Sequence, residues 1–270
     1  MVNDHREIHF YGQTTTEIFY NSGAAAFPFT RQGNAFIERG CFDQNSIVKI
    51  DNTVTFVGND RIVYTLGGYI PQRISTHAIE YQLRDATYVR AWTYTQEGHK
   101  FYVMECDRGT WLFDQATGAW HRRKSFGLDY WRCNGTVSVY GLELFCDRAT
   151  GNLYTASFAV FTENSETISV QITLPTIDNG TSQKSMYAFQ MMLETGQGNA
   201  AITDPQIVLQ YSDDGGHMWS NEMWRAAGQM GQYLHRVIWR KLGQFYTRQM
   251  RITMTDPFYR IAISYWHDLR

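Results

Sequence analysis

The residues that come nearest to a known chemical motif lie at 212–219, where the sequence reads Ser-Asp-Asp-Gly-Gly-His-Met-Trp. This run fits the Asp-box pattern Ser-x-Asp-x-Gly-x-Thr-Trp, apart from Met218 where the pattern has threonine. In such a loop the aspartate accepts backbone N–H groups, the glycines supply positive φ, and the tryptophan packs back on the sheet. We therefore interpret four of its residues as a structural turn: Ser212, Asp214, Gly216 and Trp219.

An Asp box does not by itself indicate an enzyme. Such boxes occur in sialidases, but there they lie away from the chemistry. A sialidase also needs an arginine cluster with a Tyr–Glu pair, which a single sequence neither assembles nor refutes. Carboxylate pairs for another glycosidase are equally unassignable, because the separation that matters is spatial. A glycan-binding or sialidase-like protein therefore stays open as an alternative function.

Other catalytic and metal-binding patterns do not occur in the sequence. It contains no GxSxG, no P-loop, no GxGxxG between a strand and a helix, and no HExxH. The eight histidines show no metal-ligand spacing. His77 and Glu80 share a possible helical face, which we interpret as a solvated or capping pair. We expect no catalytic residue, no metal site, no cofactor and no enzymatic activity.

A basic stretch at 235–242, followed by Arg248 and Arg251, is the candidate interaction surface. On a strand the basic side chains at 236 and 240 share one face, and the residues at 237, 239 and 241 point to the other. Arginine interleaved with tryptophan suits base stacking, an interface hot spot, or a plain solvated edge. The net charge of −2 favours protein over nucleic acid, so direct contact with nucleic acid is not expected. The candidate protein interface comprises Arg236, Trp239, Arg240 and Arg248.

Composition indicates a globular protein built of strands. Of the 270 residues, 43% are apolar and 15% are aromatic, and aromatic rings suit pleated, half-buried surfaces. The 19 arginines against 5 lysines fit extensive partner contact or codon bias. The four cysteines form no CxxC pair, so we expect buried free thiols in a protein made in a reducing cytosol. No apolar run approaches the ~20 residues that a membrane helix needs, and no membrane association is expected.

Period-two alternation predicts many short strands. Residues 6–11 and 16–20 form a predicted hairpin around Gly12-Gln13, and residues 47–57 and 61–65 form another. Only residues 76–83 read as a helix, and a short one. Further strand-like runs lie at 88–95, 100–105, 110–113, 136–144, 152–157, 167–173, 186–193, 206–211, 236–242, 248–255 and 260–265.

An internal repeat favours one architecture over others. Asp-Arg recurs at 60–61, 107–108 and 147–148, and Cys-Asp-Arg-x-Thr occurs at 106–110 and again at 146–150. Glycine followed by an aromatic residue marks the start of a later strand in each unit, as in Gly68-Tyr69 and Gly118-Ala-Trp120. Repeats of ~40–50 residues built from antiparallel strands are typical of β-propeller blades.

We therefore predict an all-β fold, a β-propeller or propeller-like array of about five antiparallel hairpin blades. The alternative is two β-sandwich-like domains whose hairpins are similar by coincidence. Residues 1–161 would form the blades, and the polar residues 162–184 a protruding loop or boundary. Residues 185–270 would form a C-terminal β unit that carries the Asp-box hairpin and closes the propeller.

Several longer stretches resemble the packaged-DNA stabilisation proteins of short-tailed, podovirus-type double-stranded DNA bacteriophages. In the N-terminal half they are Thr16-Glu-Ile-Phe-Tyr-Asn-Ser-Gly23, residues 33–40, Asp51-Asn-Thr-Val and residues 68–78. In the C-terminal part they are residues 211–221, Arg236-Val-Ile-Trp-Arg-Lys-Leu-Gly and Thr255-Asp-Pro257. Similarity is weaker between residues 85 and 185.

The resemblance implies a structural protein of the virion, with no catalytic residues to carry over. It implies a tail hub that plugs the head after DNA packaging and joins the portal adaptor to tail spikes and the tail needle. It also implies a homo-oligomeric ring in the virion tail, assembled in the host cytoplasm. Family members of this kind are longer than 270 residues.

Overall fold

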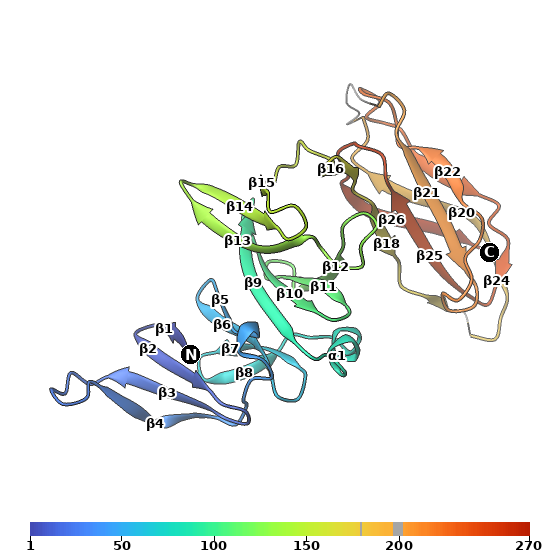
Figure 1. The fold of residues 1–270 in the computed structure, drawn as a ribbon. Helices are drawn as coiled ribbons and strands as arrows, with labels where there is room; N and C mark the ends of the chain where they lie inside the picture. Colours follow the sequence, from blue (N-terminus) through green and yellow to red (C-terminus); the bar gives the residue numbers. More distant parts are fainter. Residues whose placement is uncertain (179, 197–201) are drawn as a thin grey trace. The chain divides into compact units, whose positions relative to one another are not determined.

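The computed structural model describes residues 1–178, 180–196 and 202–270, and within them the chain consists of strands with one α-helix (Figure 1). The chain divides into two compact units, Met1–Ala156 and Ser157–Arg270. No helix in the described residues is long and apolar enough to cross a membrane. The predicted all-β fold is confirmed.

The first unit contains, in its described residues, four antiparallel sheets that follow one another along the chain (Figure 1). The first sheet has the order β1 (Val2–Asp4), β2 (Glu7–Tyr11), β3 (Thr16–Asn21) and β4 (Phe29–Ile37). The second has the order β5 (Val48–Ile50), β6 (Thr53–Val57), β7 (Val63–Gly67) and β8 (Ile70–Arg73). The third has the order β12 (Ala119–Arg123), β11 (Gly109–Asp114), β10 (His99–Cys106) and β9 (Val89–Gln96), and the fourth β13 (Cys133–Val139), β14 (Leu142–Asp147) and β15 (Leu153–Thr155).

Two short helices complete the first unit. The 3-10 helix η1 (Gln44–Ser46) precedes the second sheet, and α1 (His77–Leu83) connects the second sheet to the third. The α1 helix buries Ile79 and Leu83 against both sheets. The short helix predicted at 76–83 is confirmed, with Thr76 as its N-cap residue.

Neighbouring sheets share apolar seams, so the first unit is a stack. The seam between the first and second sheets contains Ile18, Ala35, Ile37, Val54, Phe56, Tyr64 and Leu66. The seam between the second and third contains Ile50, Val57, Val63, Val89, Tyr102, Met104 and Cys106. The seam between the third and fourth contains Trp92, Tyr94, Val103, Leu112, Trp131, Cys133 and Phe145. Burying each large apolar side chain stabilises the stack by roughly 1.5–3 kcal/mol.

Strand β10 shows why the sequence builds a two-faced sheet. Its last five residues, 102–106, are all buried, although a strand with one wet face alternates buried and exposed positions. Tyr102 and Met104 point into the seam with the second sheet, and Val103 points into the seam with the fourth. A strand that is apolar on both faces requires a neighbour on each side.

Two turns of the first unit share one sequence and one hydrogen-bond pattern, and they show which parts of the repeat are equivalent. The aspartates of Asp-x-Ala-Thr-Gly runs at 114–118 and 147–151 accept the alanine N–H (3.0 and 2.8 Å) and the threonine hydroxyl (2.8 and 2.7 Å). These turns connect β11 to β12 and β14 to β15, whereas Asp107-Arg108 lies between β10 and β11. The Asp147 turn is therefore equivalent to the Asp114 turn, and the two Cys-Asp-Arg-x-Thr runs occupy different turns.

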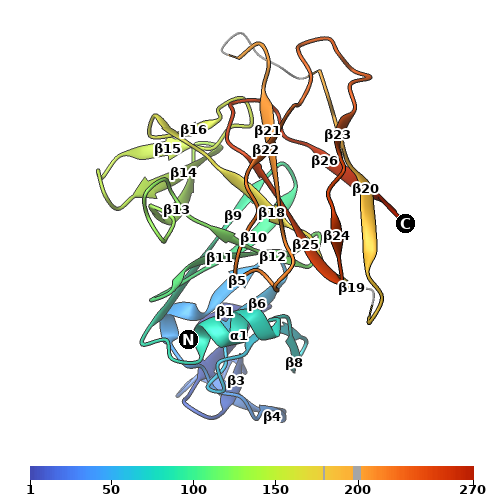
Figure 2. The same ribbon diagram turned by 90° about the vertical axis from the view of Figure 1, so that its right-hand side faces the viewer.

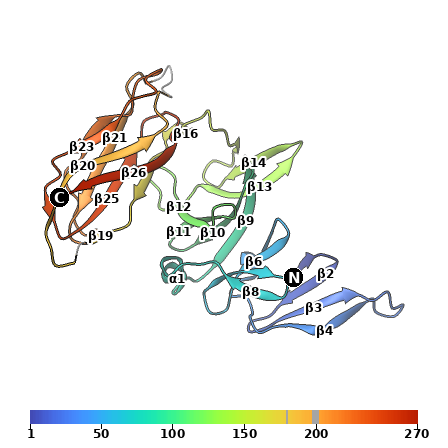
Figure 3. The same ribbon diagram turned by 180° about the vertical axis from the view of Figure 1, so that it is seen from behind.

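The described residues of the second unit form two main sheets that enclose one core (Figure 2 and Figure 3). One sheet has the order β18 (Val170–Thr173), β25 (Thr247–Met254), β21 (Gln206–Ser212) and β22 (Met223–Ala226), and β19 (Ile177–Asp178) also pairs with β25. In the other, β20 (Lys184–Leu193) pairs with β23 (Val237–Arg240), β24 (Gln244–Phe245) and β26 (Ala262–Leu269). A separate hairpin pairs β16 (Thr162–Glu163) with β17 (Glu166–Thr167).

The core of the second unit draws side chains from both sheets. Met186, Phe189 and Met191 come from β20, and Trp239 comes from β23. They meet a facing set from β21 and β25: Ile207, Leu209, Met250, Ile252 and Met254. Four of the about five expected units thus correspond to the stacked sheets, while the one at 212–219 lies in the second unit.

Candidate functional site

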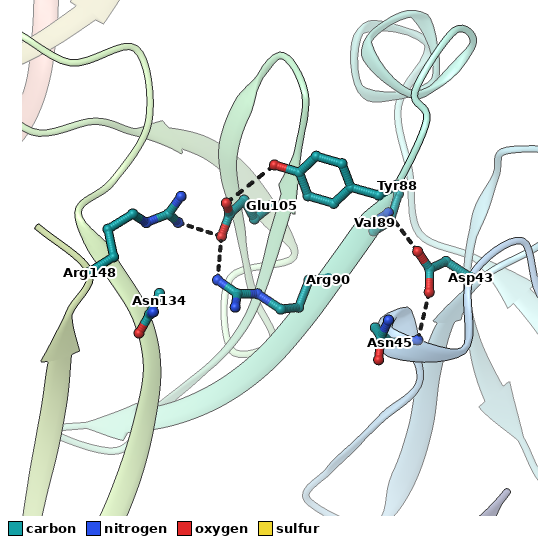
Figure 4. A pocket seen from close by; sticks show the side chains of 8 residues that line it. All are labelled: Asp43, Asn45, Tyr88, Val89, Arg90, Glu105, Asn134 and Arg148. Atoms are coloured by element: carbon teal, nitrogen blue, oxygen red, sulfur yellow. Dashed lines mark hydrogen bonds and ion pairs between the residues drawn. The ribbon is translucent and has the colours of Figure 1, made fainter.

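A pocket of about 370 Å³ in the first unit is the candidate site (Figure 4). Its polar lining comes from four parts of the stack: η1, the start of β9, β10, and the fourth sheet. The lining residues are Asp43, Asn45, Tyr88, Val89, Arg90, Glu105, Asn134 and Arg148.

Glu105 lies at the centre of this pocket and is buried on β10 (Figure 4). Arg90 lies directly opposite it on β9, and its guanidinium donates to the Glu105 carboxylate at 2.9 Å. Arg148, from the turn after β14, approaches the same carboxylate to 2.5 Å. Burial raises the pKa of Glu105, but the hydrogen bonds and charges of Arg148 and Arg90 outweigh it and hold that pKa below its ordinary value.

Asp43 is occupied by backbone groups on the other side of the pocket. One carboxylate oxygen accepts the N–H of Asn45 at 2.9 Å, and the other accepts the N–H of Val89 at 3.0 Å. The side chain therefore caps η1 and ties that segment to the start of β9. Both carboxylate oxygens of Asp43 are thus engaged in backbone hydrogen bonds that stabilise the fold.

The pocket is suited to holding sheets together rather than to proton transfer. Two guanidinium groups face two carboxylates, so its charges balance. A general acid near neutral pH needs a raised carboxyl pKa, whereas Glu105 is held ionised. Tyr88 donates to Glu105 only at 3.4 Å, and burial raises its pKa, so it keeps its proton. Arg148 of the fourth sheet thus pairs with Glu105 of the third as an ionic tie.

The loop at 212–219 forms a turn held by its own hydrogen bonds. The Ser212 hydroxyl donates to Asp214 at 2.7 Å and accepts the N–H of Gly216 at 2.8 Å. Asp214 also accepts the N–H groups of His217 and Met218, at 3.0 and 2.9 Å. These backbone bonds, the Met218 bond foremost, lower the pKa of the exposed Asp214 carboxyl.

The remaining Asp-box residue, Trp219, packs within the second unit. Its ring lies under the Arg251 guanidinium, 3.9 Å from the ring centre, which is a cation–π contact. Gly215 and Gly216 have φ of 76° and 95°, values that residues with a Cβ rarely adopt. The turn therefore depends on glycine at both positions.

The four candidate interface residues separate into two pairs. Arg236, directly before β23, and Arg240, the last residue of β23, are both exposed. Trp239 and Arg248 are each only 1% exposed and lie in the core of the second unit, not on the surface expected for an interface. Trp239 donates its indole N–H to the carbonyl of Met223 at 2.8 Å.

Arg248 is buried because the alternation of β25 places it among core residues. The even-numbered positions of this strand are buried, so Arg248 shares a face with Met250 and Ile252. Its guanidinium donates to both carboxylate oxygens of Asp213, at 2.6 and 2.7 Å, and to the carbonyl of Leu242 at 2.6 Å. The alternation of the strand indicated that Arg248 is buried. The pairing with Asp213 could not be predicted in this way, because the two residues are distant in sequence.

The described residues contain no cluster of three or more His, Cys, Asp or Glu side chains arranged to hold a metal ion. All four cysteines are free: Cys106 and Cys133 are buried, and Cys41 and Cys146 are partly exposed. Burial raises the pKa of Cys133 to about 11, so this thiol stays protonated at neutral pH.

Two family models match the chain. One, described as bacteriophage P22 Gp10, beta-propeller, matches residues 1–160, and another, bacteriophage P22 Gp10, beta-sandwich, matches residues 169–264. They confirm the predicted propeller for the N-terminal part and the alternative sandwich for the C-terminal part. No curated protein matches the chain.

Several solved structures have a distant likeness to the chain. One of them is an exo-beta-1,3-galactanase from Phanerochaete chrysosporium with galactose, at 10% identity and a TM-score of 0.32. The alignment covers 96% of this chain and 76% of that one. A likeness at this level carries no argument about fold or function.

Proposed function

Because the chain belongs to the bacteriophage P22 Gp10 family of packaged-DNA stabilisation proteins, we propose that it is a tail hub that plugs the filled phage head. In this role it joins the portal adaptor to the tail spikes and the tail needle. It acts in the virion tail as a homo-oligomeric ring after assembly in the host cytoplasm. Its contribution is mechanical and involves no bond-making step.

The observation that carries the proposal is the match of the two family models to both parts of the chain, residues 1–160 and 169–264. One matching part alone would leave the function of the other part open. A chain that matches the same phage protein along both units supports one structural role for the whole.

The construction of the first unit suits a plug. Its apolar seams join each sheet to the next, and close-packed interiors resist compression. The Glu105–Arg148 pair adds an ionic tie between the third and fourth sheets. DNA packed under pressure is better held by a stiff body than by a loop that must order itself.

The exposed arginines at the two ends of β23 are proposed partner contacts. Arg236 directly precedes the strand and Arg240 ends it, and in the described part of the second unit the strand pairs with β20 alone. Arginine forms hydrogen-bonded pairs with carboxylates at interfaces better than lysine does. We assign this edge to another tail protein that presents acidic groups.

The proposal is tested by assembling phage particles with and without this chain and locating it by cryo-electron microscopy. We expect density for the chain in the tail, together with retained binding to purified portal–adaptor complexes. A chain that is absent from the particle and binds glycans saturably would overturn the proposal and favour the glycan-binding alternative.

A further inference from the structure

The candidate pocket contains two side-chain amides whose hydrogen-bonding groups are unused. Asn45 of η1 lines one side of the pocket and Asn134 of β13 lines the other (Figure 4). Within the described residues neither carboxamide has a hydrogen-bond partner, although the backbone N–H of Asn45 donates to Asp43. Each amide group therefore offers two N–H donors and one acceptor oxygen to a molecule that enters the pocket.

A β-bulge accompanies Asn134. In the pairing of β13 with β14, Cys133 lies opposite Asp147, and the ladder resumes at Thr136 after one extra residue on the β13 side. The bulge thus falls on Asn134-Gly135. A bulge bends its strand and changes the direction of a side chain, and bulges are frequent next to active sites. The local backbone is therefore of the kind that serves to aim a side chain.

Other residues of the lining have unused hydrogen-bonding capacity as well. Arg90 donates to Glu105 through Nη2 at 2.9 Å, and among the described residues its Nε and Nη1 have no hydrogen-bond partner. The Asp43 oxygens each accept one backbone N–H, and a carboxylate oxygen can accept a second hydrogen bond. Tyr88, which is 40% exposed, adds an aromatic ring. The pocket thus presents donors and acceptors together with one apolar surface.

This combination narrows the ligand to one chemical class. An anion would meet the carboxylates of Glu105 and Asp43, and a cation would meet the two guanidinium groups. An apolar molecule would leave the amides unpaired, which costs binding free energy. A molecule that is neutral and carries several hydroxyl groups matches the lining, because each hydroxyl both donates and accepts.

We propose that this pocket binds a single sugar ring. Its volume of about 370 Å³ lies near the lower end of the ~300–1,000 Å³ that is typical of small-molecule sites, which suits one ring rather than a chain of rings. Sugar hydroxyls bond to the amides of Asn45 and Asn134 and to Arg90, and an apolar C–H face of the ring packs on Tyr88. The Glu105–Arg148 ion pair is retained in the complex and keeps the third and fourth sheets together around the ligand.

The sugar has two possible sources, a free monosaccharide or the terminal unit of a glycan chain, since both present the same hydroxyls. The test therefore titrates the full wild-type chain with glucose, galactose, mannose and N-acetylglucosamine, and separately with the polymers dextran and mannan. Saturation-transfer-difference NMR detects the bound sugar. We expect saturable binding of at least one probe. Binding of a polymer assigns the ligand to a glycan chain, whereas binding of free sugars alone assigns it to a soluble sugar.

Two variants locate the bound sugar in the pocket. Asn45→Ala and Asn134→Ala each remove one amide, and each should raise the Kd for the bound probe about tenfold. Neither asparagine belongs to the Glu105–Arg148 pair, so circular dichroism and urea unfolding should match wild type. If Asn134→Ala disturbs the bulge, Asn45→Ala alone decides the outcome, because Asn45 is an exposed residue of η1.

The matched control is Asn34→Ala, which removes an exposed amide on β4, outside the pocket. It should leave the Kd unchanged. Two results would overturn the assignment of a sugar site: no saturable binding of any of the six probes, or wild-type Kd values for both pocket variants.

Sugar binding goes beyond the proposed function, and the two can fail separately. Particles supplied with Asn45→Ala should protect their DNA as particles with wild-type chain do, because the amide lies outside the contacts that stiffen the stack. A chain that enters particles but binds no sugar refutes the sugar site and leaves the tail role standing. A chain that binds sugar in the pocket but never enters particles refutes the tail role and leaves the sugar site standing.

Discussion

The Arg148 guanidinium lies 2.5 Å from the buried carboxylate of Glu105, and this pair joins the fourth sheet of the stack to the third. Arg90 approaches the same carboxylate from β9. A carboxylate that is shared by two arginines inside a seam is a tie between layers, and it limits how far neighbouring sheets can slide.

Replacing Glu105 tests this tie. Glu105→Gln removes the charge that both arginines face, and we expect the first unit to lose about 1–3 kcal/mol of unfolding free energy, since both arginines are partly exposed. Urea titration followed by tryptophan fluorescence measures the loss. The matched control, Glu38→Gln at an exposed position, should change stability by less than about 0.5 kcal/mol. Equal midpoints for the two variants would contradict the tie.

Acid stability depends on Asp147. Burial raises its pKa, but hydrogen bonds from Thr150 and Ala149 and from Arg132 at 2.7 Å lower it to about 2. Because the folded pKa lies below the ordinary value of 3.8, the stabilisation is complete above pH ~4 and is lost as pH falls toward about 2.

Asp147→Asn should therefore destabilise the chain at neutral pH by about 2 kcal/mol and flatten the acid limb of the stability curve between pH ~4 and ~2. Urea unfolding at a series of pH values checks both. Parallel acid limbs for the variant and the wild type would show that Asp147 is not the titrating group.

The core arginine of the second unit offers another test. Arg248→Ala removes the partner of Asp213 and leaves space around Tyr211 and Phe245, whose rings lie 4.0 and 4.4 Å from the guanidinium. We expect a loss of about 3 kcal/mol or more in unfolding free energy. Arg240→Ala, on the exposed side of β23, should stay within about 0.5 kcal/mol of wild type. If the two arginine variants unfold together, Arg248 is not the core residue described here.

The turn at 212–219 is tested at its second glycine. Gly216 has φ of 95°, and a Cβ there would meet the Gln249 amide oxygen at 3.2 Å. Gly216→Ala should destabilise the second unit by about 1–3 kcal/mol, as measured by thermal unfolding. Gly33→Ala, where φ is not positive and a Cβ meets nothing within 4 Å, is the control and should be neutral or stabilising. A tolerated Gly216→Ala would mean that the loop has another conformation.

Many of the strands could be predicted from the sequence, because the alternation of buried and exposed residues along a strand is a local property. The hairpin at 6–11 and 16–20 appears as β2 and β3, and helix α1 ends at the predicted residue. The alignment of the repeats was harder to predict. The two Cys-Asp-Arg-x-Thr runs look alike in sequence, but the turns that are equivalent in the structure are the Asp-x-Ala-Thr-Gly runs at 114–118 and 147–151. The hydrogen bonds within the turns, rather than short sequence matches, identify which turns are equivalent.

The residues of the candidate site were harder to predict from the sequence than the strands. Glu105 and Arg148 belong to different sheets, and no periodicity indicates that two such residues meet. Arg248 was assigned to a surface by its charge, although its position on β25 places it beside Met250 in the core. Arginine is rarely buried, so its charge suggested a surface position more strongly than the strand pattern suggested the core. The contacts that make its burial possible, with Asp213 and the Leu242 carbonyl, are visible only in the structure.

In the proposed function, this chain holds packaged DNA inside the phage head. The most direct measurement is nuclease protection of DNA in particles assembled without the chain and in the same particles supplied with it. We expect particles without it to fill and then lose their DNA to nuclease, and we expect wild-type chain to restore protection. Full protection in its absence would contradict the proposed function.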